Sequence, residues 1–233
     1  MKIWTSRLRA PIVTAFCLAG LVPAFGAALN ISPILLEAPA PQQTLTLTLR
    51  NPGDRPITGQ VRVYAWSQPN GEDDLQETTA VEASPPLVDV RPGADYTVRV
   101  VRMAGGPVSG EEAYRVVVEE VPEAAARRSG VVQIAMRYLV PVFFFDPFAG
   151  QARLSWSVVH KGGAAFLAAQ NDGDRAIKLH DVKLGGKPAG RENIGWILGH
   201  SQRLFALGKT APATLHVTAM AGKEPINATA EAK

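Results

Sequence analysis

Apolar and polar residues alternate in short stretches along most of the chain. Between residues 44 and 49 threonine and leucine take turns, so that Leu45, Leu47 and Leu49 share one face. This period of two predicts a strand with one buried face. From residue 29 onward similar stretches recur at spacings of roughly 8 to 12 residues, separated by Pro, Gly, Asn and Asp. Helical periodicity is nearly absent, so the pattern predicts an all-β fold of sandwich type.

The pattern breaks around residues 146–150, and a new series of strands begins at Leu154. We therefore predict a first domain over residues 29–147, a second over 152–222 and a flexible tail over 223–233. A faint internal repeat supports two related domains. Residues 51–57 and 171–177 share Asn, Gly, Asp, Arg and Ile at the same spacing, as two sandwiches with one kind of hairpin turn would.

Residues 1–28 are typical of an export signal. Three basic residues precede an apolar stretch over 10–24 that ends in small residues. A transmembrane anchor would need about 20 unbroken apolar residues, whereas Pro11 and Pro23 interrupt this stretch. We predict a signal peptide, an exported mature chain and no membrane insertion of that chain.

Charge and cysteine content narrow the function further. Without residues 1–28, the 24 basic residues lose Lys2, Arg7 and Arg9, which leaves 21 against 21 acidic ones. Such a balance argues against electrostatic capture of nucleic acid. The single cysteine, Cys17, leaves with the signal, so no disulfide or cysteine metal site is expected.

An enzyme is not indicated. No Asp or Glu stands at metal-ligand spacing from a pair of histidines, and no serine has the setting of a nucleophile elbow. We predict no catalytic residue, no metal and no cofactor. The four histidines are His160, His180, His200 and His216.

Several segments, in order, carry a resemblance to a known family. The chain resembles the periplasmic chaperones of the chaperone-usher pilus pathway over nearly all of its mature length. The matching segments are residues 29–36 with Ile31, Ser32 and Pro33; 61–66 with Gln68; Ser84 to Pro86; Pro92 and Gly93; Val98 to Val100; Tyr114 and Arg115; Glu120 to Pro122; 132–143; Asn171 with Gly173; and Gly195 to Gly199 before Arg203.

The resemblance implies a fold and a function. The fold would be two immunoglobulin-like β-sandwich domains in an L-shaped (boomerang) arrangement. The function would be to bind and stabilise pilus or fimbrial subunits in the periplasm by donor-strand complementation, and to deliver them to an outer-membrane usher. In this mechanism the chaperone lends a strand to a subunit that lacks one.

One strand is the candidate donor. Val132, Ile134, Met136 and Tyr138 alternate with smaller or polar residues, so one face carries bulky apolar groups. These four residues are the predicted subunit-binding site. The alternative is an ordinary core strand of the first domain, because alternation does not show which face meets water.

The chain departs from the better-known family pattern at two positions. Where relatives hold the subunit's terminal carboxylate with Arg and Lys, this sequence has Pro33 and Pro141. This difference resembles the archaic branch, which serves subunits of the spore-coat-like type. The carboxylate would then be held elsewhere or not at all. The candidate anchors are Arg99, Arg102 and Arg137.

Arg99 has a second possible role. Relatives place an Arg and a Glu of the first domain in an interdomain charge cluster, and Arg99 and Glu111 match those positions. Arg99 could therefore be a structural ion-pair partner rather than a subunit anchor.

Two further functions remain open at this point. The chain could be a structural immunoglobulin-like subunit or adhesin of the exported polymer. It could also be a chaperone for thin surface polymers or capsule-like antigens, with the same mechanism and a different cargo.

Overall fold

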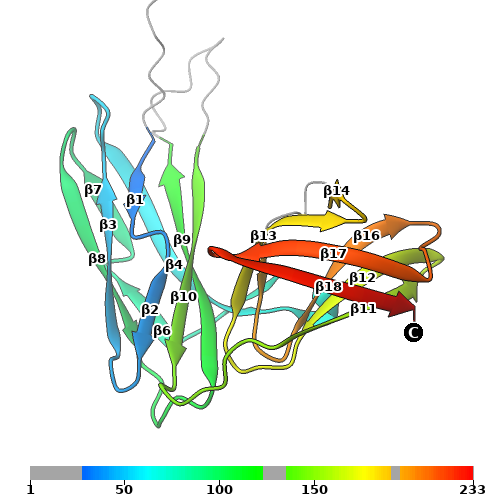
Figure 1. Ribbon diagram of the computed structural model, residues 1–233. Helices are drawn as coiled ribbons and strands as arrows, with labels where there is room; N and C mark the ends of the chain where they lie inside the picture. Colours follow the sequence, from blue (N-terminus) through cyan, green and yellow to red (C-terminus); the bar gives the residue numbers. More distant parts are fainter. Residues whose placement is uncertain (1–27, 123–134, 190–194, 233) are drawn as a thin grey trace, which may run out of the picture.

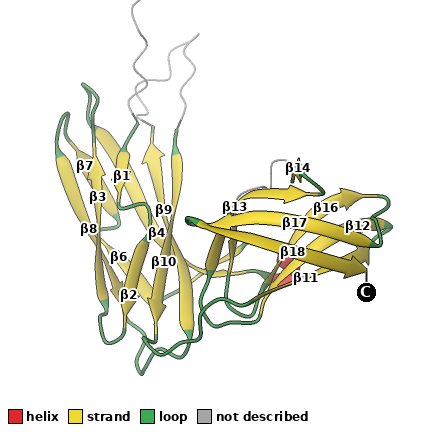
Figure 2. Cartoon of the chain, viewed as in Figure 1, coloured by secondary structure: helices red, strands yellow, loops and turns green. Residues whose placement is uncertain are grey.

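The computed structural model describes residues 28–122, 135–189 and 195–232. Strands dominate these residues, and one short 3-10 helix, Pro69–Gly71, stands apart from them (Figure 2). In Figure 1 the strands of the first domain stand upright and the strands of the second domain extend sideways from it, so the molecule is L-shaped. The predicted all-β, two-domain fold is confirmed.

The first domain is a sandwich of two sheets. One sheet has the order β1-β3-β8-β6, and the other has the order β2-β10-β9-β4-β5 with β7 also paired to β4. The first sheet comprises β1 (Asn30–Ser32), β3 (Thr44–Arg50), β8 (Asp95–Arg102) and β6 (Val81–Ser84). The second comprises β2 (Leu36–Pro39), β10 (Arg137–Phe145), β9 (Glu111–Val121), β4 (Ile57–Ser67), β5 (Asp74–Glu77) and β7 (Leu87–Val90).

The alternation read from the sequence accounts for the core of this domain. Leu47 and Leu49 of β3 are fully buried and Leu45 is partly buried against the same cluster, while the threonines between them point away from it. Val98 and Val100 of β8 meet them from the neighbouring strand. Burial of such side chains contributes about 1.5–3 kcal/mol each.

The second domain forms one hydrogen-bonded sheet of eight strands around its own core, which includes Leu167, Leu179 and Phe205. The order is β14-β13-β17-β18-β11-β12-β16, and β15 pairs with β13. The strands are β11 (Leu154–Lys161), β12 (Ala164–Asn171), β13 (Ile177–Leu184), β14 (Lys187–Pro188), β15 (Gly195–Ile197), β16 (Gln202–Gly208), β17 (Thr214–Ala221) and β18 (Glu224–Ala232).

The flexible tail predicted over 223–233 is wrong, because residues 224–232 form β18. This strand pairs with β17 from Glu224 to Glu231 and with β11 at its end. Ile226, Ala228 and Ala230 alternate with polar residues and pack against the core of the second domain. Two of these three residues are alanines, which made the alternation hard to recognise as a strand.

The internal repeat corresponds to one hydrogen-bond network that occurs twice. Asn51 is fully buried; its amide donates to the carbonyls of Arg55 (2.6 Å) and Val90 (2.9 Å), and its side-chain oxygen accepts from the N–H of Gly53. Asn171 is equally buried. It makes the same kinds of bond with Arg175, Leu198 and Gly173. The repeat therefore marks equivalent turns in two related domains.

Candidate functional site

Half of one strand edge lacks a partner within the part of the chain that the structure describes. On one side, β10 pairs with β9 from Arg137 to Phe145. On its other side it pairs with β2 only from Val142 onward. We call the remaining stretch, Arg137–Pro141, the open edge. Unpaired backbone N–H and C=O groups of this kind are a template for another strand.

The open edge exists because the N-terminal segment changes sheets. β1 pairs with β3 in the first sheet, and the chain then crosses at residues 33–35 to form β2 in the second sheet. β2 therefore covers only the lower half of β10, as Figure 1 shows for the blue and green strands beside each other. The upper half of β10 has no paired strand on this side among the described residues.

The side chains of β10 that face inward form one continuous row. Phe144, Val142 and Val140 are buried in the core of the first domain, and Tyr138 is partly buried against that core. Met136 continues the row and is 39% exposed. The row thus begins inside the domain and runs out of it along the open edge.

Two of the four predicted donor residues lie in this row, Met136 and Tyr138. The other two, Val132 and Ile134, fall outside the described residues. The sequence allowed two interpretations of this strand, a donor strand and an ordinary core strand of the first domain. Each interpretation fits a different half of the strand. From Val140 onward the strand is a core strand, whereas at Met136 the same face is accessible.

Glu120 organises the upper end of the open edge. Its carboxylate accepts hydrogen bonds from the N–H of Leu29 (2.9 Å), the N–H of Met136 (3.4 Å) and the hydroxyl of Tyr138 (3.3 Å). Burial, with the nearby Glu120 charge, raises the pKa of Tyr138 to about 12, so its hydroxyl stays protonated and donates. Glu120 thereby ties the start of β1 to the start of β10.

The opposite face of β10 looks toward the second domain. Phe143 packs with Trp66 of β4 and with Leu198 and Trp196 of the second domain. The Phe143 and Trp196 ring centroids are 5.1 Å apart, and Trp66 meets Trp196 edge to face at 6.4 Å. Leu139, further up this face, is 45% exposed. The junction between the domains is thus a buried apolar contact around Phe143, whereas the same face of β10 is exposed to solvent at Leu139.

Charged groups also link the domains. Arg175 of the second domain donates to the carboxylates of Glu111 (2.6 Å) and Glu37 (3.1 Å), and it lies 3.5 Å over the ring of Phe145. Glu111 also accepts from the N–H of Ala176 at 2.7 Å. Burial raises the pKa of Glu111, and these hydrogen bonds partly offset the rise.

The structure does not bring Arg99 to Glu111. Arg99 lies on β8 in the other sheet of the first domain, where its side chain is exposed. The partner of Glu111 is Arg175, so the arginine of the cluster comes from the second domain. The repeated turn motif had already singled out Arg175, but sequence alone gave no sign that it crosses the junction.

Gln68 also links the two domains, through its neutral amide group. Its amide nitrogen donates to the carbonyl of Trp196 (2.8 Å) and to Asp73 (2.7 Å), and its amide oxygen accepts from the N–H of Leu198 (2.9 Å). Because Gln68 is buried, losing these bonds would leave unsatisfied polar groups between the domains.

The other two predicted anchors, like Arg99, lie away from the junction. Arg102 is buried and engaged: it binds Glu112 through two hydrogen bonds of 2.6 and 2.8 Å and also donates to two carbonyls. Its guanidinium lowers the pKa of Glu112, first through these hydrogen bonds. Arg137 is half exposed and lies 3.2 Å from Glu119 on the neighbouring strand.

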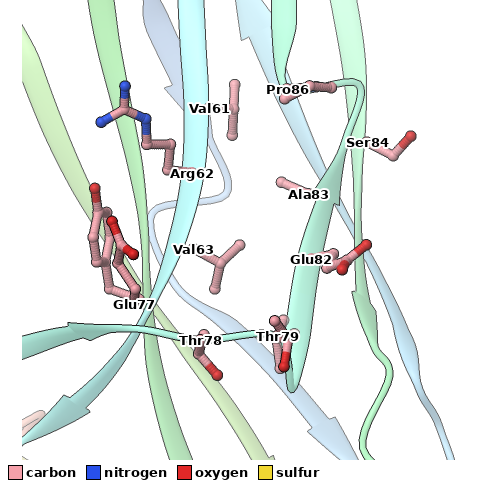
Figure 3. A pocket seen from close by; sticks show the side chains of 12 residues that line it. Val61, Arg62, Val63, Glu77, Thr78, Thr79, Glu82, Ala83, Ser84 and Pro86 are labelled. Atoms are coloured by element: carbon pink, nitrogen blue, oxygen red, sulfur yellow. The ribbon is translucent and has the colours of Figure 1, made fainter.

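A second opening lies at the opposite side of the sandwich. β6 is the last strand of its sheet, and a cleft of about 680 Å³ separates it from residues 61–64 of β4. Figure 3 shows Val61 and Val63 on one wall and Ala83 and Glu82 on the other. The cleft carries charges of both signs, including Arg62, and it is separate from the open edge.

Within the described residues, no helix is long and apolar enough to cross a membrane.

The fold and the open edge define a two-domain, immunoglobulin-like protein that offers half a strand edge to a partner. The chain belongs to the family described as pili and flagellar-assembly chaperones: the PapD N-terminal domain of that family matches residues 28–147. A comparison with curated proteins returns no significant match.

Several solved structures of pilus chaperones are similar to this chain. One is the CsuC–CsuE chaperone–tip adhesion subunit pre-assembly complex from the archaic Csu pili of Acinetobacter baumannii, with 23% identity, a TM-score of 0.74, and coverage of 89% of this chain and 100% of that one. Another is the E. coli chaperone DraB, with 20% identity, a TM-score of 0.61, and coverage of 87% and 98%. A third is the Salmonella enterica SafA pilin in complex with the SafB chaperone, with 17% identity, a TM-score of 0.65, and coverage of 86% and 95%.

At these identities the structures show a shared fold over almost the whole of both chains. The family predicted from the sequence is confirmed by the match to the first domain. Membership of a chaperone family does not favour the alternative of a structural subunit or adhesin.

Proposed function

We propose that the chain is a periplasmic chaperone that lends the strand leading into and along the open edge to a pilus subunit. A subunit that lacks one strand exposes unpaired backbone groups beside an apolar groove, and both are costly in water. Pairing with β10 satisfies those backbone groups by β-augmentation. The chaperone thereby keeps the subunit folded without any chemical step.

The observation that carries this proposal is the row of inward-facing side chains on β10. Because Val140 and Tyr138 belong to the core of the first domain and Met136 follows them outward, a subunit docked at the open edge would share one continuous core with the chaperone. From the alternation in the sequence we expect Val132 and Ile134, which lie outside the described residues, to belong to the same face of the strand. Four such side chains contribute roughly 6–12 kcal/mol before the costs of association.

The cargo and the pathway follow from the family and from the departures at Pro33 and Pro141. We assign the chain to the archaic branch, with subunits of the spore-coat-like type as cargo and an outer-membrane usher as the recipient. The signal over residues 1–28 would direct the chain to the periplasm. Similarity to the archaic Csu complex supports this assignment.

The donor role is tested by two charge substitutions one residue apart. Met136→Asp places a carboxylate in the row that enters the subunit, where it has no partner and is costly to bury. Ala135→Asp, the matched control, places the same charge on the opposite face of the strand. Each variant is coexpressed with the cognate pilus subunit, and the complex is copurified.

We expect both variants to fold, since Met136 and Ala135 are exposed. Recovery of the complex should fall at least tenfold for Met136→Asp and stay near the wild-type level for Ala135→Asp. Equal recovery with both variants would contradict the donor assignment. Unfolding of Met136→Asp alone would instead favour an ordinary core strand.

A further inference from the structure

Glu120 is a half-buried carboxylate whose contacts in the structure are all with neutral donors. It accepts hydrogen bonds from the N–H groups of Leu29 and Met136 and from the hydroxyl of Tyr138. Within the part of the chain that the structure describes, no lysine, arginine or histidine forms an ion pair with it. A carboxylate that has lost part of its water is stabilised by a positive partner.

The backbone nitrogen of Leu29 is the closest of the three donors, at 2.9 Å from Glu120 Oε1. This nitrogen is held in place by the residues that follow it. The Leu29 side chain is 2% exposed and belongs to the core of the first domain, and β1 begins at the next residue, Asn30. A charge on this nitrogen would therefore lie against Glu120 without any rearrangement of the fold.

The same nitrogen lies at a possible end of the signal. Signal cleavage needs small residues at the first and third positions before the cut. Gly26 and Ala28 meet this need for a cut before Leu29, and Ala24 and Gly26 meet it for a cut two residues earlier, before Ala27. Only the cut before Leu29 converts its peptide N–H into an α-ammonium group.

The two products differ in what they offer Glu120. In the shorter product a positive charge lies at the position of the Leu29 nitrogen, and a hydrogen bond between charged partners is roughly twice as strong as a neutral one. In the longer product the ammonium group is two residues away, up to about 7 Å along an extended chain. The shorter product therefore supplies the counter-charge that Glu120 lacks.

We propose that the signal is removed between Ala28 and Leu29, and that the new α-ammonium group pairs with Glu120 and thereby orders the start of the donor strand. Glu120 holds that strand at two residues: its own N–H donates to the carbonyl of Met136 (3.0 Å), and its carboxylate accepts from Met136 and Tyr138. Proteolytic maturation completes the open edge at the end where its inward row leaves the domain. The inference rests on the export proposed above and adds a structural consequence to it.

The first test identifies the N-terminus of the mature protein. The full chain is expressed in a Gram-negative host, purified from the periplasm and measured by intact mass. We expect the first residue to be Leu29. A mature chain that begins at any other residue would overturn the inference and leave the proposed function intact. A chain that keeps residues 1–28 would contradict the proposed export, and the inference would fail with it.

The second test compares chains that begin at Leu29 and at Ala27. Both are released from an N-terminal fusion by a protease that leaves no extra residue. Each is made as wild type, as Glu120→Gln and as the control Glu119→Gln, which removes a carboxylate paired with Arg137 instead. We expect the first domain of the shorter wild type to melt about 3 °C higher than that of the longer one. Glu119→Gln should keep this difference, and Glu120→Gln should abolish it.

The pH dependence separates the ammonium group from other effects of chain length. Pairing with Glu120 should raise the pKa of the α-ammonium group above its ordinary value of about 7.7–8.0. The advantage of the shorter chain should therefore be complete near about pH 6.5 and lost by about pH 11, as the group loses its proton in the folded protein. A difference that persists in Glu120→Gln, or that does not change with pH, would overturn the ion pair.

Hydrogen exchange of the free protein tests the link to the donor strand. Over residues 136–138 we expect slower exchange in the chain that begins at Leu29 than in the chain that begins at Ala27. Residues 142–145, which β2 covers in both, serve as the internal control. Equal exchange over residues 136–138 would show that the pair does not order the donor strand and would contradict that part of the inference.

Discussion

Asn51 and Asn171 show how much one buried polar side chain can hold together. Each ties a turn to the strand behind it through hydrogen bonds with its amide nitrogen and its side-chain oxygen. The bonded backbone groups have no access to other partners once the asparagine is removed. Buried groups left unsatisfied in this way cost about 1–3 kcal/mol.

We therefore predict that Asn171→Ala lowers the free energy of unfolding of the second domain by about 3 kcal/mol, since several backbone groups lose their partner. Asn227→Ala, at an exposed position on β18, should change it by less than about 0.5 kcal/mol. Urea unfolding followed by circular dichroism measures both. Equal effects of the two variants would contradict the structural role of the repeated turn.

For single residues, the sequence predicted which side chains have a structural role better than it predicted which residues they contact. The spacing of Asn51 and Asn171 pointed to equivalent turns, because the motif is local in the chain. The partner of Glu111 was not predictable, since Arg175 is 64 positions away and the pairing depends on how the two domains meet.

Among the elements, β18 differs most from the sequence-based expectation. Its inward residues are small, so the apolar signal is weak, yet Ala230 is fully buried at the centre of the second domain. A strand can be specified by a lack of space as well as by large apolar groups, because only small side chains fit beside the core there.

This assignment predicts opposite outcomes for neighbouring substitutions on β18. Ala230→Arg forces a long charged side chain into the core and should unfold the second domain at ambient temperature. Thr229→Arg, on the exposed face, should leave the melting temperature of that domain within a few degrees of wild type. Thermal unfolding checks both, and a well-folded Ala230→Arg would mean that the segment is a flexible tail after all.

The strands of the first domain were easier to predict than the edge they form. Alternation of Leu and Thr in β3, and of bulky and small residues around Met136, follows directly from the period of two in a strand. Alternation does not reveal which edge lacks a partner, because that depends on β1 and β2 lying in different sheets. The alternation along this strand was therefore predictable, and the accessibility of its edge was not.

For the whole molecule, the two domains meet at a junction built to be stable. Apolar packing of Trp66 and Phe143, the buried Gln68 and the ion pair of Arg175 with Glu111 all contribute. The two domains therefore meet at a corner, with the open edge on one arm. A bound strand would run along that edge toward the corner.

Hydrogen–deuterium exchange of the chain, free and in complex with its subunit, tests the central claim most directly. Strand pairing slows exchange of the backbone amides that it covers. We predict that exchange slows on binding over residues 135–141, with little change over residues 142–145, which β2 already covers. Slower exchange at β6 and residues 61–64 of β4, with residues 135–141 unchanged, would place the partner at the other opening and contradict the account.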